Sequence, residues 1–66
     1  MTKMKFYNSN LVILTDNEEY ISIERDGMKD YNVADVIAYL MKVENISEAE
    51  ASEIADAMLA HEWITE

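Results

Sequence analysis

Residues 32–43 read NVADVIAYLMKV, and they decide the fold because the spacing of the apolar residues changes there. Upstream, apolar and polar residues alternate, whereas within this stretch the apolar residues recur at helical spacing and form one broad stripe. Asn32 is a favourable N-cap residue, and Asp35 stands three positions after it. We therefore predict a helix over about 33–44 that covers a sheet with Val33, Val36, Ile37, Leu40, Met41 and Val43.

Upstream of this helix, period-two alternation predicts strands at about 3–15 and 19–25. The polar residues Asn8-Ser9-Asn10 are expected to form a bend or bulge within the first of these segments. The run Leu11–Leu14 is apolar throughout, which suits a strand that is covered on both faces or that lies at a subunit contact.

Two turns are expected to separate the strands. Asp16-Asn17-Glu18 suits a hairpin loop. Asp26 and Gly27 suit a type I′ turn, because that turn needs positive φ and Gly27 is the only glycine of the chain. Residues 28–31 would then be free to return as a short third strand.

A second helix is predicted downstream, over about 48–63. Asn45 can end the first helix, and Ser47 with Glu50 matches the S-x-x-E capping box, in which each side chain binds a backbone N–H. No proline or repeat interrupts this order. The sequence thus predicts one α+β domain over residues 1–66, with a short antiparallel sheet of two or three strands followed by two helices (ββ(β)αα) packed on one face.

The size of the chain limits its stability. A chain of 66 residues buries only about 60% of the surface that its unfolded form exposes, so small domains usually add a disulfide, a metal or a second subunit. Cysteine is absent, and the single histidine, His61, cannot form a zinc site alone. We therefore expect no metal and no cofactor, and we favour a homodimer over a monomer.

The charge is strongly negative and unevenly distributed. Fourteen acidic residues stand against five basic ones, a net charge of 5 − 14 = −9. Residues 1–42 carry seven acids and all five bases, whereas residues 43–66 carry seven acids and no Lys or Arg. Binding to nucleic acid or to an anionic membrane depends on Lys and Arg, so direct contact with either is disfavoured. The expected partner is a basic, Lys/Arg-rich protein surface.

The second predicted helix provides the candidate binding surface. Glu50, Glu53 and Asp56 recur every three residues, and neighbours at that spacing lie about 5–6 Å apart at Cβ. One interpretation is a mimic of a phosphate track; the other is an ordinary solvated face whose first-turn acids suit the helix dipole. Exposed tyrosines beside carboxylates suit arginine-rich partners. The predicted partner-binding residues are Glu48, Glu50, Glu53, Asp56, Asp35, Glu44, Tyr39 and Tyr20.

No catalytic constellation is visible, so we predict that the chain is not an enzyme. Its serines have one histidine among them and no glycine-rich oxyanion loop. His61 and Glu62 are adjacent on a helix and therefore point in different directions. Residues 16–19 offer oxygen ligands but lack the spacing and the glycine of a calcium loop. No apolar run has the length of a membrane helix or a signal-peptide core, so we expect a cytoplasmic protein.

The overall character of the chain resembles that of small phage-encoded inhibitors of host enzymes. The resemblance covers the length, the lack of Cys and Pro, the strands followed by helices, and an acidic helix that begins at Ser47-Glu48-Ala49-Glu50. That group includes anti-CRISPR and antirestriction proteins, uracil-glycosylase inhibitors, and inhibitors of host polymerase or nuclease. The resemblance includes no shared motif and assigns no residue a role. It implies stoichiometric inhibition by occupation of a basic groove, in the cytoplasm of the host cell.

Two hypotheses of different classes follow. The first is an acidic inhibitor that occupies the cationic nucleic-acid-binding site of a host enzyme or defence complex by DNA or RNA mimicry. The alternative is a small structural or regulatory homodimer with an apolar interface, formed by Leu11–Leu14 or by the Val36–Met41 stripe. Binding of the first kind weakens steeply with salt, whereas the dimer responds little to salt and has a concentration-dependent melting temperature.

Overall fold

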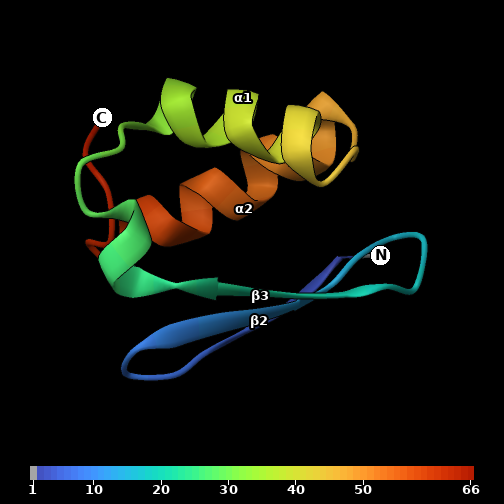
Figure 1. Ribbon diagram of the computed structural model, residues 1–66, viewed down its shortest axis with the longest axis horizontal. Coiled ribbons are helices and arrows are strands. Elements are labelled where there is room, and N and C mark those ends of the chain that lie inside the picture. Colours follow the sequence, from blue (N-terminus) through green and yellow to red (C-terminus); the bar gives the residue numbers. More distant parts are fainter. Residues whose placement is uncertain (1) are drawn as a thin grey trace.

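The computed structural model describes residues 2–66 (Figure 1). The elements are, in order, β1 (Lys3–Phe6), β2 (Asn10–Leu14), β3 (Tyr20–Glu24), the 3-10 helix η1 (Arg25–Met28), α1 (Val33–Val43) and α2 (Glu48–Ala60). The strands form one antiparallel sheet in the order β1-β2-β3. Figure 1 shows both helices on the same side of this sheet. The predicted α+β fold, a short sheet followed by two helices on one face, is confirmed.

The segment predicted as one strand over 3–15 forms two strands, β1 and β2. They pair antiparallel, with Lys3 opposite Leu14. The chain reverses between them, where the Tyr7 backbone N–H donates to the Asn10 carbonyl oxygen at 2.8 Å. Of the two predicted alternatives, a bend or a bulge, the structure has the bend, and it is tight enough to reverse the chain. Asn and Ser favour such a reversal, which lets the flanking apolar residues pair across strands.

The loop predicted between β2 and β3 is a hairpin turn, as expected. The Glu18 backbone N–H donates to the Thr15 carbonyl oxygen at 2.9 Å, and the Thr15 backbone N–H donates to the Glu19 carbonyl oxygen at 2.9 Å. Glu18 adopts a left-handed conformation with φ of 63°. This turn sets the β2–β3 register.

The turn and the strand predicted after β3 are wrong. Gly27 lies inside η1, and its φ is not positive, so it does not form a type I′ turn. Residues 28–31 form a turn in which the Tyr31 backbone N–H donates to the Met28 carbonyl oxygen at 2.9 Å. This helical turn buries the Met28 side chain in the core, which an exposed hairpin would not do.

Helix α1 begins where the sequence predicts. The Asn32 side chain accepts a hydrogen bond from the Asp35 backbone N–H at 2.8 Å, and the Asp35 carboxylate accepts one from the Asn32 backbone N–H at 3.4 Å. These two bonds form a capping box. Val36 and Leu40 are fully buried, but Met41 and Val43 are 41% and 57% exposed. The apolar stripe that packs is therefore narrower than the one predicted.

Helix α2 ends at Ala60, before the predicted end at residue 63. Glu62 has a φ of 62°, and its backbone N–H donates to the Leu59 carbonyl oxygen at 3.0 Å. The Trp63 backbone N–H donates to the Met58 carbonyl oxygen at 2.9 Å, which completes a Schellman motif. The chain thus turns back at the helix end and places Trp63 in the core, 6% exposed.

The core lies between the helices and one face of the sheet. Leu11 and Ile13 of β2 are fully buried, whereas Val12 and Leu14 alternate with them and are only half-buried on the other face. The run Leu11–Leu14 is therefore covered by helices on one face only. The buried apolar residues are Leu11, Ile13, Ile23, Met28, Val36, Leu40, Ile46, Ala51, Ile54, Ala55, Met58, Trp63 and Ile64.

Candidate functional site

Glu50 does not belong to an exposed acidic face, and the prediction that its carboxylate stands in solvent beside Glu53 and Asp56 is wrong. Its side chain is 5% exposed, and Oε2 accepts hydrogen bonds from the Thr2 hydroxyl and from the Asp16 backbone N–H, both at 2.8 Å. Position 50 precedes the buried residues Ile54 and Met58 at four-residue spacing, so it lies on the packed side of α2. The carboxylate links α2 to the start of β1 and to the β2–β3 turn.

Both ends of α2 are held against the rest of the fold. At the N-terminal end, the Ser47 hydroxyl accepts a hydrogen bond from the Glu50 backbone N–H at 3.2 Å. This is one half of the predicted capping box, since the Glu50 carboxylate binds the sheet end instead. At the C-terminal end, the Phe6 ring stacks on His61 with centroids 3.7 Å apart and meets Trp63 edge-on at 5.2 Å. The orientation of the helix is therefore defined at both ends.

The solvent face of α2 carries two carboxylates that stand close together. Glu53 and Asp56 are both exposed, and their three-residue spacing places their Cβ atoms about 5–6 Å apart. Ala49 and Ala60 are exposed on the same face. Glu48, in the first turn, is exposed at the flank of this face. The α2 acidic face is defined here as Glu48, Glu53 and Asp56.

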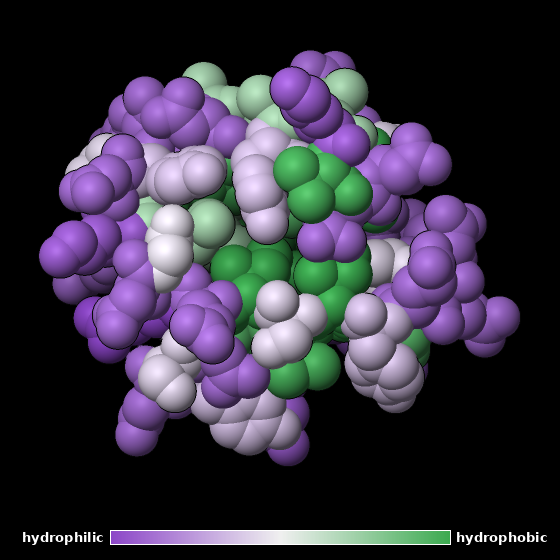
Figure 2. All heavy atoms as spheres, in the orientation of Figure 1, coloured by the Kyte–Doolittle hydropathy of each residue, from purple (hydrophilic) through white to green (hydrophobic). Residues whose placement is uncertain are grey.

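No ion pair within residues 2–66 neutralises these carboxylates. Of the seven acidic residues in 43–66, five are exposed, namely Glu48, Glu53, Asp56, Glu62 and Glu66. No ion pair joins any of the five to a Lys or Arg within residues 2–66. Figure 2 shows hydrophilic residues over most of the visible face, around a small hydrophobic group near its centre. The negative potential of this half of the chain is therefore available to a partner.

The other predicted site residues do not converge on the α2 acidic face. The Asp35 carboxylate is used in the α1 capping box, and Glu44 is the half-buried C-cap residue of α1. Tyr39 is half-buried and packs edge-on against Tyr31, with centroids 6.1 Å apart. Tyr20 is 76% exposed but projects from β3 on the side of the sheet away from the core. Only Glu48, Glu53 and Asp56 of the predicted set share one surface.

A second uncovered surface is the side of the sheet that faces away from the helices, and it includes two residues, Val12 and Leu14, of the run predicted as a possible subunit contact. Strand alternation places on it residues of all three strands. The strand register aligns them in rows, with Lys3, Leu14 and Tyr20 in one row and Lys5, Val12 and Ser22 in the next. This outer sheet face consists of Lys3, Lys5, Tyr7, Asn10, Val12, Leu14, Tyr20, Ser22 and Glu24.

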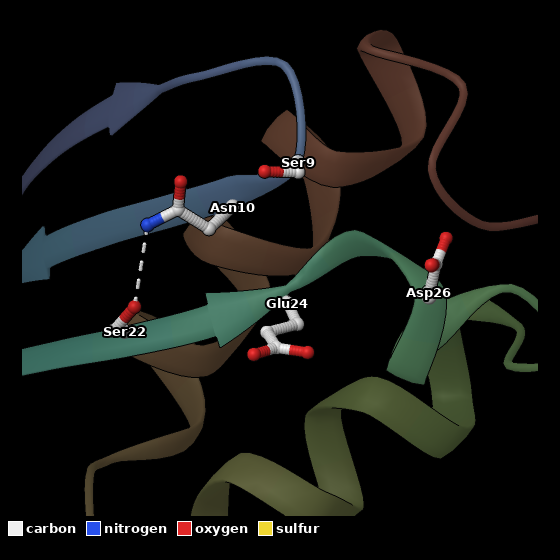
Figure 3. Close-up of a pocket in the computed structure, with 5 residues that line it drawn as sticks. All are labelled: Ser9, Asn10, Ser22, Glu24 and Asp26. Atoms are coloured by element: carbon white, nitrogen blue, oxygen red, sulfur yellow. Dashed lines mark hydrogen bonds between the residues drawn. The ribbon is translucent and has the colours of Figure 1, made fainter.

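The outer sheet face has two chemically different parts. On the β1 side is an apolar hollow that also contains cations, lined by Lys3, Met4, Lys5, Tyr7, Val12, Leu14 and Tyr20. Within it the Lys5 ammonium lies 5.6 Å from the centroid of the Tyr7 ring. At the far end of β3 is a polar hollow lined by Ser9, Asn10, Ser22, Glu24 and Asp26 (Figure 3). Figure 3 shows the Asn10 amide directed at the Ser22 hydroxyl, a hydrogen bond of 3.4 Å.

Residues 2–66 contain no group of three or more His, Cys, Asp or Glu side chains placed to hold a metal ion. The segment 16–19 instead forms the β2–β3 turn, and its Asp16 N–H binds Glu50. Across the same residues, no helix combines the length and the apolar character that a membrane span requires. A scan against protein-family models and searches of curated proteins and of solved structures found no match. Functional assignment therefore depends on the two uncovered surfaces.

Proposed function

We propose that this chain is a protein-binding inhibitor that presents the α2 acidic face to a Lys/Arg-rich nucleic-acid-binding site of a host enzyme or defence complex. The observation that carries the proposal is the set of unneutralised carboxylates after Lys42, where seven acids occur without a single Lys or Arg. A site that binds phosphates is a complementary surface for such a field, and complementary charge speeds association as well as selecting the partner.

The geometry of α2 supports binding by a rigid face. The helix is fixed at both ends, so its carboxylates are positioned before the partner arrives and less ordering entropy is lost on binding. The small side chains Ala49 and Ala60 let a partner approach closely. Because Glu50 is buried, the regular phosphate-like spacing is limited to Glu53 and Asp56, with Glu48 about 7.5 Å further along the helix axis.

The proposal is tested by capture followed by competition. The chain is immobilised and exposed to bacterial lysate at about 0.1 M and about 1 M salt, between which the Debye length falls from about 10 Å to about 3 Å. We expect nucleic-acid-binding proteins to be retained at the lower salt and lost at the higher. Each retained protein is then purified and bound to a labelled DNA or RNA, and free chain is added as competitor.

Charge reversal identifies the surface responsible. The variant E53K/D56K should no longer compete with nucleic acid for the captured protein. Its affinity for that protein should fall at least about tenfold, since close charge pairs across an interface couple by about 1.5 kcal/mol or more. The matched control is E18K/E19K, which makes the same change in net charge on the exposed β2–β3 turn. The proposal is contradicted if both variants compete as well as the original chain, or if captured proteins keep their nucleic acid in its presence.

A further inference from the structure

We infer that the outer sheet face is the contact between two copies of this chain, packed sheet against sheet about a twofold axis that runs along β2. The inference concerns a surface separate from the α2 acidic face and does not depend on the proposed function. It starts from what the helices leave uncovered. Val12 and Leu14 are only half-buried, and the adjacent rings of Tyr7 and Tyr20 are 49% and 76% exposed.

The charges of this face are arranged so that it complements itself. Lys3 and Lys5 lie on β1 at one edge, Glu24 lies on β3 at the other edge, and the apolar residues of β2 lie between them. An interface between identical copies about a twofold axis brings the same patch together from both sides, so the patch must complement itself. A surface with cations at one edge and an anion at the opposite edge does so when one edge faces the other.

An axis along β2 provides that pairing. It places β1 of one copy over β3 of the other and preserves the rows of the sheet, so that Lys3 faces the ring of the partner's Tyr20, a cation–π arrangement. Lys5 faces the partner's Ser22 and lies about two residues, or roughly 7 Å, along the strand from the partner's Glu24, within reach of an extended lysine side chain. By contrast, an axis across the strands would place the lysines of β1 against each other.

The size of the face determines the strength of the contact. Three strands about 4.8 Å apart and five residues long at about 3.3 Å per residue cover roughly 14 by 17 Å. This planar footprint, about 240 Å² on each copy, lies below that of standard specific interfaces, which bury about 800 Å² per partner, so the dimer is weak and concentration-dependent. The net charge of −9 per chain opposes association. However, the α2 acidic faces belong to the helical layers on the far sides of the paired sheets, and charges more than a Debye length apart, about 8 Å at physiological salt, are largely screened.

The first measurement is the mass of the chain in solution. Sedimentation velocity from about 1 μM to about 1 mM, the range that a weak complex requires, should show a shift from the 7.6 kDa mass of one chain toward twice that value. A single-chain mass at every concentration would overturn the inference.

The second measurement uses charge reversals whose mixture distinguishes contacts between chains from contacts within one chain. K5E alone places two acids in each pairing region, and E24K alone places two cations there, so each should weaken self-association by about tenfold or more. When the two variants are mixed in equal amounts, the acids at positions 5 and 24 of the K5E chain lie within reach of the lysines at positions 24 and 5 of the E24K chain. A heterodimer should then form at concentrations where neither variant dimerises.

Controls with the same change in net charge separate the local from the global effect. K42E and E53K alter exposed helical residues away from the outer sheet face, and both should dimerise like the original chain. Circular dichroism checks that all variants are folded. Two results would assign any dimer to another surface. In the first, the K5E chain dimerises as tightly as K42E. In the second, the mixture of K5E and E24K stays monomeric.

Discussion

Glu50 is the residue whose substitution tests the described packing of α2 most sharply. Its Oε2 accepts from the Thr2 hydroxyl and from the Asp16 backbone N–H at 2.8 Å, and the side chain is 5% exposed. Glu50→Ala removes the acceptor of both donors. The Thr2 hydroxyl retains the Asp16 carboxylate at 3.3 Å, but the Asp16 N–H loses the carboxylate that it binds. The one donor left unsatisfied costs about 1–3 kcal/mol, and the lost Thr2–Glu50 hydrogen bond costs about 1 kcal/mol more, so we expect a loss of about 2–4 kcal/mol of unfolding free energy.

That loss is large for a chain of this size. At about 0.05–0.15 kcal/mol per residue, 66 residues have a total stability of about 3–10 kcal/mol. The melting temperature should fall by about 10–30 °C, since 1 kcal/mol corresponds to about 4–8 °C in a small domain. Urea unfolding followed by the fluorescence of Trp63, the only tryptophan and a buried one, measures the change directly.

Two variants complete this test. Glu50→Gln keeps a carbonyl oxygen that can accept both bonds, so it should cost only about 1 kcal/mol, the difference between charge-assisted and neutral acceptors. Glu53→Ala, one turn later on the exposed face, should change stability by no more than about 0.5 kcal/mol. If Glu50→Ala were no more destabilising than Glu53→Ala, the buried hydrogen bonds would not be what holds the N-terminal end of α2.

Two further substitutions test the helix ends. Glu62→Gly should raise the unfolding free energy by about 1 kcal/mol, because glycine adopts the left-handed conformation of the Schellman motif without the strain of a Cβ. Glu62→Ala keeps that strain and should not raise the unfolding free energy. Equal urea midpoints for the two variants would refute this explanation. Asn32→Ala should lower the thermal midpoint by an amount equivalent to about 1 kcal/mol, because the α1 cap is lost. Asn32→Asp should retain most of that stability, since Asp also caps helices. Equal thermal midpoints for the two variants would count against the cap.

Much of the fold could be predicted because its local signals agree with one another. The change of apolar spacing at Asn32 located α1, and the side chain and backbone of Asn32 and Asp35 form the capping box that begins it. Prediction was less accurate where two conformations suit the same residues. Asp26-Gly27 fits a hairpin turn as well as a 3-10 turn, and only the burial of Met28 decides between them.

The candidate site was predicted in part. Three-residue spacing identified Glu53 and Asp56 as neighbours, but the same spacing grouped Glu50 with them, although Glu50 also precedes Ile54 and Met58 at the spacing of the packed side. That second spacing is the signal that could have shown its burial. The buried Glu50 carboxylate is stabilised by hydrogen bonds from the Thr2 hydroxyl and the Asp16 N–H. Both donors lie far from Glu50 in the sequence, so no local pattern reveals them.

The outer sheet face could be identified only from the three-dimensional arrangement, for a different reason. Strand alternation places Tyr7 and Tyr20 opposite the core residues of their strands, but a strand pattern does not tell which face the helices cover. The alternation of Leu11 and Ile13 with Val12 and Leu14 is hidden in a run that is apolar throughout. Only the placement of both helices on one side shows that the other side is free (Figure 1).

The central claim is that carboxylates on one exposed helix face bind a cationic partner. Isothermal titration of the captured protein against E53Q/D56Q and against E18Q/E19Q tests it most directly, because the two variants have the same net charge and differ only in where two charges are removed. The proposed role of the α2 acidic face predicts that the dissociation constant is several-fold larger for E53Q/D56Q and unchanged for E18Q/E19Q. The two dissociation constants should become equal at about 1 M salt. Equal affinities at low salt would contradict it.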